Sequence, residues 1–134
     1  RPEEGMQFMG SLNAVVVALE AIAKAITGNP FQQEAWKPVT FQNSWVNFGS
    51  GAQTCAYMKD SMGFVHLKGL MKSGTVGTTA FTLPPGYRPA ATSRFVCFGN
   101  GSSTVADLFA DGQFTAYTTN VSWSLDNVIF RAEN

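Results

Sequence analysis

The chain has 134 residues, of which 45% are hydrophobic and 13% aromatic, with nine basic and nine acidic side chains. This length and composition suit a single folded domain with a sizeable core, and they exclude disorder as a description of the whole chain. The net charge of zero and the lack of any Lys or Arg run exclude the attraction that drives nucleic-acid and anionic-membrane binding. The longest apolar stretch, residues 14–23, contains a glutamate and is too short to span a bilayer. The chain begins at Arg1 without a signal-peptide pattern, so we expect a fragment of a longer protein.

Residues 6–27 are rich in helix-forming residues and contain no proline, and Gly28-Asn29-Pro30 provides a stop, which predicts a helix. Its apolar positions alternate steps of four and three, the mean spacing of a heptad seam. This seam consists of Phe8, Leu12, Val15, Leu19, Ile22 and Ile26, and a second seam of Met9, Val16 and Ala23 lies beside it. The width of the apolar band and its β-branched residues favour a coiled coil of three helices over one of two. We therefore predict that residues 1–30 form the coiled-coil stalk of a homotrimer. The alternative is an amphipathic helix that lies on its own β domain.

From residue 31 to residue 134, glycine and turn residues recur about every ten positions, as in a sandwich of short antiparallel strands. We predict a mostly β fold with a jelly-roll-like head over residues 31–134. The expected strands are 40–48, 54–60, 63–72, 78–83, 93–98, 104–110, 113–118 and 123–131. Within 63–72, alternation predicts a core face of Val65, Leu67 and Met71, and an outer face of Phe64, His66, Lys68 and Leu70. Residues 60–63 and 110–113 carry the Asp and Gly that tight hairpins select.

The two cysteines, Cys55 and Cys97, permit at most one disulfide. A small secreted scaffold that depends on disulfides usually has more. We predict two buried thiols, in keeping with assembly in a reducing cytosol.

Several motifs follow one another in a distinctive order. They are the run from Tyr57 to Gly69, the segment Phe81-Thr82-Leu83-Pro84-Pro85-Gly86-Tyr87-Arg88-Pro89, the triplet Asp111-Gly112-Gln113 and the closing run from Trp123 to Phe130. Their order resembles the C-terminal head domain of bacteriophage tail fibres and receptor-binding proteins, and the match runs over roughly residues 36–131. The resemblance implies a trimeric β head on a fibrous stem that adsorbs to bacterial surface glycans. It also implies a virion protein, assembled in the host cytoplasm and joined to the rest of the fibre or baseplate through its N-terminal side.

We interpret the framework of these motifs as structural. It comprises Asp60, Gly63, Gly69, Leu83, Pro84, Gly86, Tyr87, Arg88, Pro89, Asp111 and Gly112. The prolines around Gly86-Tyr87-Arg88 restrict the backbone and suit a rigid connection between sheets. We expect Arg88 to meet an acidic partner such as Asp60, or a carbonyl at a subunit boundary.

The sequence gives little support for catalysis or for a metal centre. His66 is the only histidine, and we expect it to pack or to hydrogen-bond between protomers. Asp60 and Asp111 fall in predicted turns, where Asp is an ordinary capping residue, and no Glu lies inside a predicted strand. There is no Gly-X-Ser-X-Gly motif to present a nucleophilic serine. We predict a protein that is not an enzyme and that uses no cofactor and no metal.

If successive strands reverse direction, the connections between them alternate between two ends of the head. The stalk-side connections are then 60–63, 84–92 and 110–113, and the far-end loops are 49–53, 72–77, 99–103 and 118–122. The far-end loops are rich in Gly, Ser, Thr and Asn, which present hydroxyl and amide groups suited to glycan hydroxyls. The candidate ligand-binding residues are Ser50, Gln53, Lys72, Thr75, Asn100, Ser102, Asn120 and Trp123. The alternative is that these loops are ordinary hairpin tips. By the same patterns Trp45 and Trp123 are typical of a core, and Trp36 is expected at the stalk junction.

The sequence thus predicts a trimeric, non-enzymatic adhesin for a bacterial surface saccharide, with no nucleic-acid partner and no membrane insertion. One alternative is a trimerisation or capping domain that binds no ligand. Another is a trimeric ligand of the C1q or tumour-necrosis-factor type that binds a protein receptor. A polysaccharide-degrading tail protein is disfavoured because no carboxylate cluster is evident.

Overall fold

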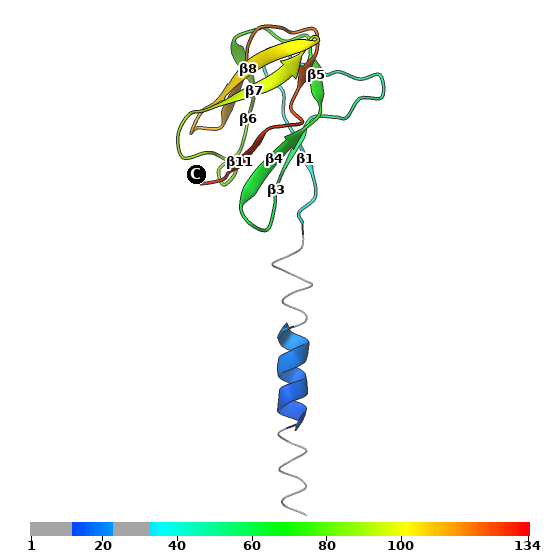
Figure 1. The fold of residues 1–134 in the computed structure, drawn as a ribbon, viewed down its shortest axis with the longest axis vertical. Coiled ribbons are helices and arrows are strands. Elements are labelled where there is room, and N and C mark those ends of the chain that lie inside the picture. Colours follow the sequence, from blue (N-terminus) through cyan, green and yellow to red (C-terminus); the bar gives the residue numbers. More distant parts are fainter. Residues whose placement is uncertain (1–11, 23–32) are drawn as a thin grey trace, which may run out of the picture. The chain divides into compact units, whose positions relative to one another are not determined.

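The chain divides into two units, residues 1–33 and residues 34–134. The computed structural model describes residues 12–22 and 33–134 (Figure 1). Residues 12–22 form a helix whose six large apolar side chains, Leu12, Val15, Val16, Val17, Leu19 and Ile22, are each 44–63% exposed. The seam residues Phe8, Met9, Ala23 and Ile26 lie outside the described residues. Among the described residues, no helix combines the length and the apolar character that crossing a membrane requires.

The second unit, which we call the head, is built from two antiparallel sheets. The smaller sheet has the order β1 (Lys37–Pro38), β3 (Ala56–Lys59), β4 (Phe64–Lys68) and β11 (Ile129–Arg131). Val65 and Leu67 of β4 point into the core, whereas Phe64 is exposed, which confirms the faces predicted from alternation. Asp60 and Gly63 close the predicted hairpin between β3 and β4, with the Gly63 N–H donating to the Asp60 carbonyl at 3.1 Å.

The larger sheet curls into a half-barrel (Figure 1). Its order is β2 (Val46–Asn47), β5 (Leu70–Lys72), β10 (Trp123–Ser124), β7 (Ser93–Gly99), β8 (Ser102–Leu108), β9 (Gln113–Ala116) and β6 (Thr78–Thr82). One segment reaches both edges of this sheet, because Phe41 bridges Phe81 of β6 while Val46 pairs with Lys72 of β5. The predicted strand 40–48 is therefore reduced to this bridge and to β2.

Two predicted strands are each broken into two, and both breaks occur at the same corner. Residues 63–72 split at Gly69 into β4 and β5, and residues 123–131 split into β10 and β11. In each case the two halves belong to different sheets. The prediction of single continuous strands was wrong here because the chain turns from one layer into the other.

Gly69 forms this corner together with the segment between β10 and β11. Its N–H donates to Asp126 Oδ1 at 2.8 Å, and its carbonyl accepts from the Leu125 N–H at 2.9 Å. Its φ is +108°, and a Cβ at this position would lie 2.5 Å from the Cα of Cys55. Only glycine fits a backbone conformation and an approach of this kind.

The core lies between the layers and is centred on aromatic rings. Phe81 and Phe114 stack at 4.8 Å, and Trp123 meets Phe114 edge-on at 5.6 Å. Trp45 and Trp123 are 1% and 0% exposed, as expected of core residues. Cys55 and Cys97 are free and buried, which confirms that prediction. Burial raises the pKa of the Cys55 thiol to about 12 and that of Cys97 to about 11, so neither is a ready nucleophile.

Candidate functional site

Glu34, the first residue of the head, joins β3 to the proline-rich connection. The Tyr87 hydroxyl donates to the Glu34 carboxylate at 2.9 Å, and the Lys59 N–H donates to Glu34 Oε1 at 2.7 Å. The Leu83 N–H donates to the Gly112 carbonyl at 2.9 Å. The connections 60–63, 84–92 and 110–113 thus meet at one end of the head, as the alternation of strand directions predicts.

A second group of loops meets through its own hydrogen bonds. The Ser73 N–H donates to the Asn120 carbonyl at 2.7 Å, and Asn120 Nδ2 donates to the Gly74 carbonyl at 2.9 Å. The Asn100 N–H donates to the Ser122 carbonyl at 3.0 Å, which brings in the turn between β7 and β8. We call residues 43–44, 72–77, 99–103 and 118–122 the loop cluster. It contains three of the four predicted far-end loops.

The fourth predicted loop, residues 49–53, lies elsewhere. This loop lies beside the first residue of β5, where the Leu70 N–H donates to the Gln53 carbonyl at 3.1 Å. The loop cluster joins the opposite end of β5, beyond Lys72. Figure 1 shows residues 49–53 as the teal loop that projects from the side of the head. The expectation that Ser50 and Gln53 share a surface with the other loops is wrong, because the chain changes sheets between β2 and β3 instead of reversing within one sheet.

Four predicted ligand-binding residues, Thr75, Asn100, Ser102 and Asn120, are exposed in the loop cluster. Lys72 is half-buried, and its ammonium lies 5.2 Å from the Phe48 ring centroid.

Trp123 is fully buried, and its indole N–H donates to the Tyr117 carbonyl at 3.1 Å. Its assignment as a ligand contact is therefore wrong. Its indole instead ties the base of the loop cluster to the core.

The backbone of the loop cluster is unusually constrained. Six non-glycine residues of the described chain have positive φ, and five of them lie in this cluster: Asn43, Ser44, Ser73, Asn100 and Thr118. Thr118 has φ +77°, an outlier for a β-branched residue. Such conformations cost about 1–3 kcal/mol each and concentrate at binding sites, where surrounding contacts hold them.

Asn43 and Ser44 were not foreseen as part of this site, because they fall inside the predicted strand 40–48. Asn43 belongs here through its contacts: its carbonyl accepts from the Thr75 N–H at 3.1 Å, and its Nδ2 donates to the Thr79 carbonyl at 2.7 Å. The signal was the Asn-Ser pair itself, since such residues interrupt strands and favour turns.

The chemistry that the loop cluster offers is hydrogen bonding. Within its ranges Lys72 is the one charged residue, and no carboxylate is present. Hydroxyls, amides and backbone groups can both donate and accept, which suits a ligand rich in hydroxyl groups.

His66 and Asp60 form the one pair in the described residues that resembles a catalytic dyad. His66 Nε2 lies 2.8 Å from Asp60 Oδ2, and Asp60 Oδ1 accepts from the N–H groups of Met62 and Phe64. The hydrogen bond to His66 lowers the pKa of the Asp60 carboxyl, helped by those two backbone donors. This arrangement fixes a hairpin turn, and His66 has its partner within its own chain.

Two further expectations concern single residues. Arg88 Nε donates to the Leu83 carbonyl of its own chain at 2.7 Å, so its partner is a carbonyl and not Asp60. Trp36 is 42% exposed, and its ring lies 4.6 Å from Lys68 Nζ. Among the described residues no group of three His, Cys, Asp or Glu side chains is placed to hold a metal ion.

The fold and this site define a mostly β head that carries a polar loop cluster. Comparison of the chain with protein-family models, with curated proteins and with solved structures gives no match in any of the three.

Proposed function

We propose that this chain is the receptor-binding tip of a bacteriophage tail fibre, a homotrimeric and non-enzymatic adhesin for a bacterial surface saccharide. It is carried on the virion, with the rest of the fibre or the baseplate on its N-terminal side. The observation that carries the proposal is the loop cluster, in which exposed Ser, Thr and Asn side chains stand on a constrained backbone. The order of the framework motifs supports the same assignment.

The loop cluster is suited to saccharides for a physical reason. Sugar hydroxyls donate and accept hydrogen bonds, and a receptor gains most when its own groups are already in place before binding. The hydrogen bonds from Ser73, Asn100 and Asn120 join these loops to one another within the chain itself. The neighbouring side chains of Thr75 and Ser102 are exposed.

The helix over residues 12–22 supports assembly of three copies. Its apolar side chains are all exposed, and a lone helix of this length is marginal in water. The heptad seam offers one way to bury these residues, against the same residues of two other chains. Three linked heads also gain avidity, which compensates for the weakness of a single shallow sugar site.

The test is direct binding. The labelled 134-residue chain is applied to a panel of purified lipopolysaccharides and capsular polysaccharides, and to the bacteria that carry them. The double variant Thr75→Ala/Ser102→Ala removes two exposed hydroxyls from the loop cluster. We expect it to bind about tenfold more weakly or worse, since each lost hydrogen bond is worth about 1 kcal/mol.

The matched control is Ser61→Ala/Thr92→Ala, which removes two exposed hydroxyls at the other end of the head. We expect it to bind like the unmodified chain. Equal binding by both double variants would remove the loop cluster as the site. A trimer that binds no saccharide on the panel would favour the capping-domain function instead.

A further inference from the structure

The outer surface of the larger sheet carries apolar side chains where a polar surface is expected. Along β7 the residues alternate, so that Cys97 and Gly99 are buried while Val96 and Phe98 point outward and are 72% and 57% exposed. Across the ladder, Val105 of β8 lies opposite Val96. These residues sit on the longest hairpin of the head, away from either edge of the sheet. With the half-buried Val105 they form one apolar patch in the middle of the sheet, and a contiguous apolar patch is what distinguishes a contact surface from scattered exposed residues.

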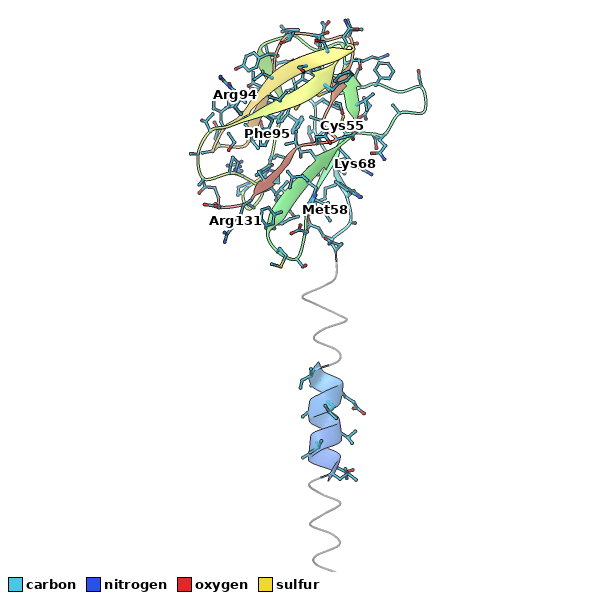
Figure 2. All side chains as sticks on the ribbon, in the orientation of Figure 1. Cys55, Met58, Lys68, Arg94, Phe95 and Arg131 are labelled. Carbon is cyan, nitrogen blue, oxygen red and sulfur yellow. The ribbon has the colours of Figure 1, made fainter. Side chains whose placement is uncertain are left out.

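An arginine held rigidly in place borders this apolar pair. Arg94 donates from Nε and Nη2 to the two oxygens of Asp107, at 2.7 Å and 3.0 Å. The Asp107 side chain is only 7% exposed and also accepts from the Tyr117 hydroxyl at 3.2 Å, whereas the Arg94 side chain is 71% exposed. Figure 2 shows Arg94 at the outside of the head. Because the ion pair already orders the guanidinium, a partner that packs on Arg94 loses little further entropy.

We define the outer face as Arg94, Val96, Phe98, Val105 and Asp107. Aromatic residues and arginine are enriched in protein–protein interfaces and contribute much of their binding energy, and the outer face has one of each beside its apolar centre. Tyr117 borders the same area, since its N–H donates to the Val105 carbonyl. A protein surface is thus the occupant that this chemistry favours.

We propose that the outer face is the contact between heads, and that its occupant is a second copy of this chain. The proposal rests on the proposed homotrimer. The chain has no net charge, and Arg94 and Asp107 cancel within the face, so two copies meet without repulsion.

The small size of the outer face is compatible with this role. A contact centred on two or three apolar residues is too small to hold free proteins together. Heads that are already joined through a stalk meet at a high effective concentration, so a weak contact is sufficient to order them.

Thiol labelling in the full-length chain tests the proposal. Val96→Cys places a thiol on the outer face, and Ile129→Cys places one on β11 of the other sheet, where Ile129 is 51% exposed. Each variant is labelled with a maleimide at a protein concentration for which light scattering has given the mass of the assembly. The rate of labelling in the native protein is then divided by the rate of labelling in denaturant. The native thiols are buried and react slowly.

We expect a trimer in which Val96→Cys is protected at least about tenfold more than Ile129→Cys, because labelling must wait for the contact to open. A trimer in which both positions are equally protected would overturn this inference and leave the proposed trimer intact. A monomer would overturn both.

A second variant measures the same contact without labelling. Val96→Lys replaces the centre of the outer face with a charge, and Ile129→Lys makes the same change on the other sheet. We expect Val96→Lys alone to lower the thermal midpoint of the assembled chain, and to do so more strongly at higher protein concentration, where the unmodified chain is fully assembled. Equal midpoints for the two variants would count against the outer face.

Discussion

Asp107 is a carboxylate on the outside of a sheet, yet its side chain is 7% exposed. Arg94, Tyr117 and the neighbouring strands cover it, and a buried charge is stable only when its partners are in place. The hydrogen bonds from Arg94 outweigh desolvation and hold the pKa of Asp107 below its usual value. Its ionised form is therefore favoured in the folded state.

Asp107→Asn should change how stability depends on pH. A carboxyl whose pKa is lowered by folding stabilises the protein above its unfolded pKa, and this contribution is lost as the pH falls through the folded value. The loss for Asp107 falls in the acid range, below about pH 4. We expect Asp107→Asn to be less stable at neutral pH by about 2 kcal/mol, with a smaller decline between neutral pH and pH 2. Urea unfolding at each pH measures this, and a decline as steep as that of the unmodified chain would contradict it.

Tyr87 connects the first residue of the head to the proline-rich connection. Its hydroxyl donates to Glu34 at 2.9 Å and accepts from Lys37 at 2.6 Å. We expect Tyr87→Phe to lose about 1–2 kcal/mol of unfolding free energy, because a hydrogen bond to a charged group is removed. Tyr57→Phe is the matched control, since Tyr57 packs edge-on against Tyr87 and makes no hydroxyl hydrogen bond to the described residues. Equal losses in urea unfolding would show that the hydrogen bonds of the Tyr87 hydroxyl add nothing to stability, since both variants keep the aromatic ring.

At the level of strands, alternation located the elements but not the layers. Val65, Leu67 and Met71 are all buried as predicted, and the pattern runs through Gly69 without a break. Period-two alternation reports which side of a strand faces the core, and this stays the same when the strand bends into a second sheet. The sign of the corner was Gly69 itself, since a glycine inside a strand often marks a bulge or a close backbone approach.

The loops, like the strands, could be located from the sequence, but the sheet that each one joins could not. Short polar hairpin tips are visible in sequence, and three of the four far-end loops do meet through hydrogen bonds. The position of 49–53 depended on which sheet each strand joins, which is a long-range property. Trp123 was counted as a ligand contact although its strand pattern pointed to the core, and the core reading is the one that burial supports.

Gly69→Ala should lower the stability of the head far more than Gly101→Ala, although both glycines have positive φ. Gly69 and Gly101 both have positive φ, so both alanine variants carry strain of about 1 kcal/mol. A Cβ at Gly101 has nothing within 4 Å, whereas at Gly69 it lies 2.5 Å from the Cys55 backbone. We expect Gly69→Ala to cost about 3 kcal/mol or more, since backbone must move, and Gly101→Ala about 1. Thermal unfolding of the two variants decides this, and similar midpoints would show that the corner can relax.

On the scale of the whole molecule, the chain carries more exposed apolar surface than its head alone requires. Val96 and Phe98 lie on one unit and the helix on the other, and both are exposed in a single chain. Neither surface is explained by the fold of the unit that carries it. The proposed trimer would bury both surfaces against one kind of partner, another copy of this chain.

The stalk seam can be tested within the helix by two substitutions only two residues apart. Leu19 lies on the predicted seam and Val17 lies off both seams, while their exposed fractions, 60% and 63%, are nearly equal. Glutamate at either position carries the same charge, so Leu19→Glu and Val17→Glu differ mainly in whether that charge faces other copies. We expect Leu19→Glu to reduce the mass in solution towards one chain and to weaken adsorption to bacteria by about 100-fold or more, because avidity is lost. Val17→Glu should remain trimeric and adsorb normally. Equal loss of assembly in both variants would show that the contact is not confined to the seam, and unchanged mass in both would mean that the heads assemble without the helix.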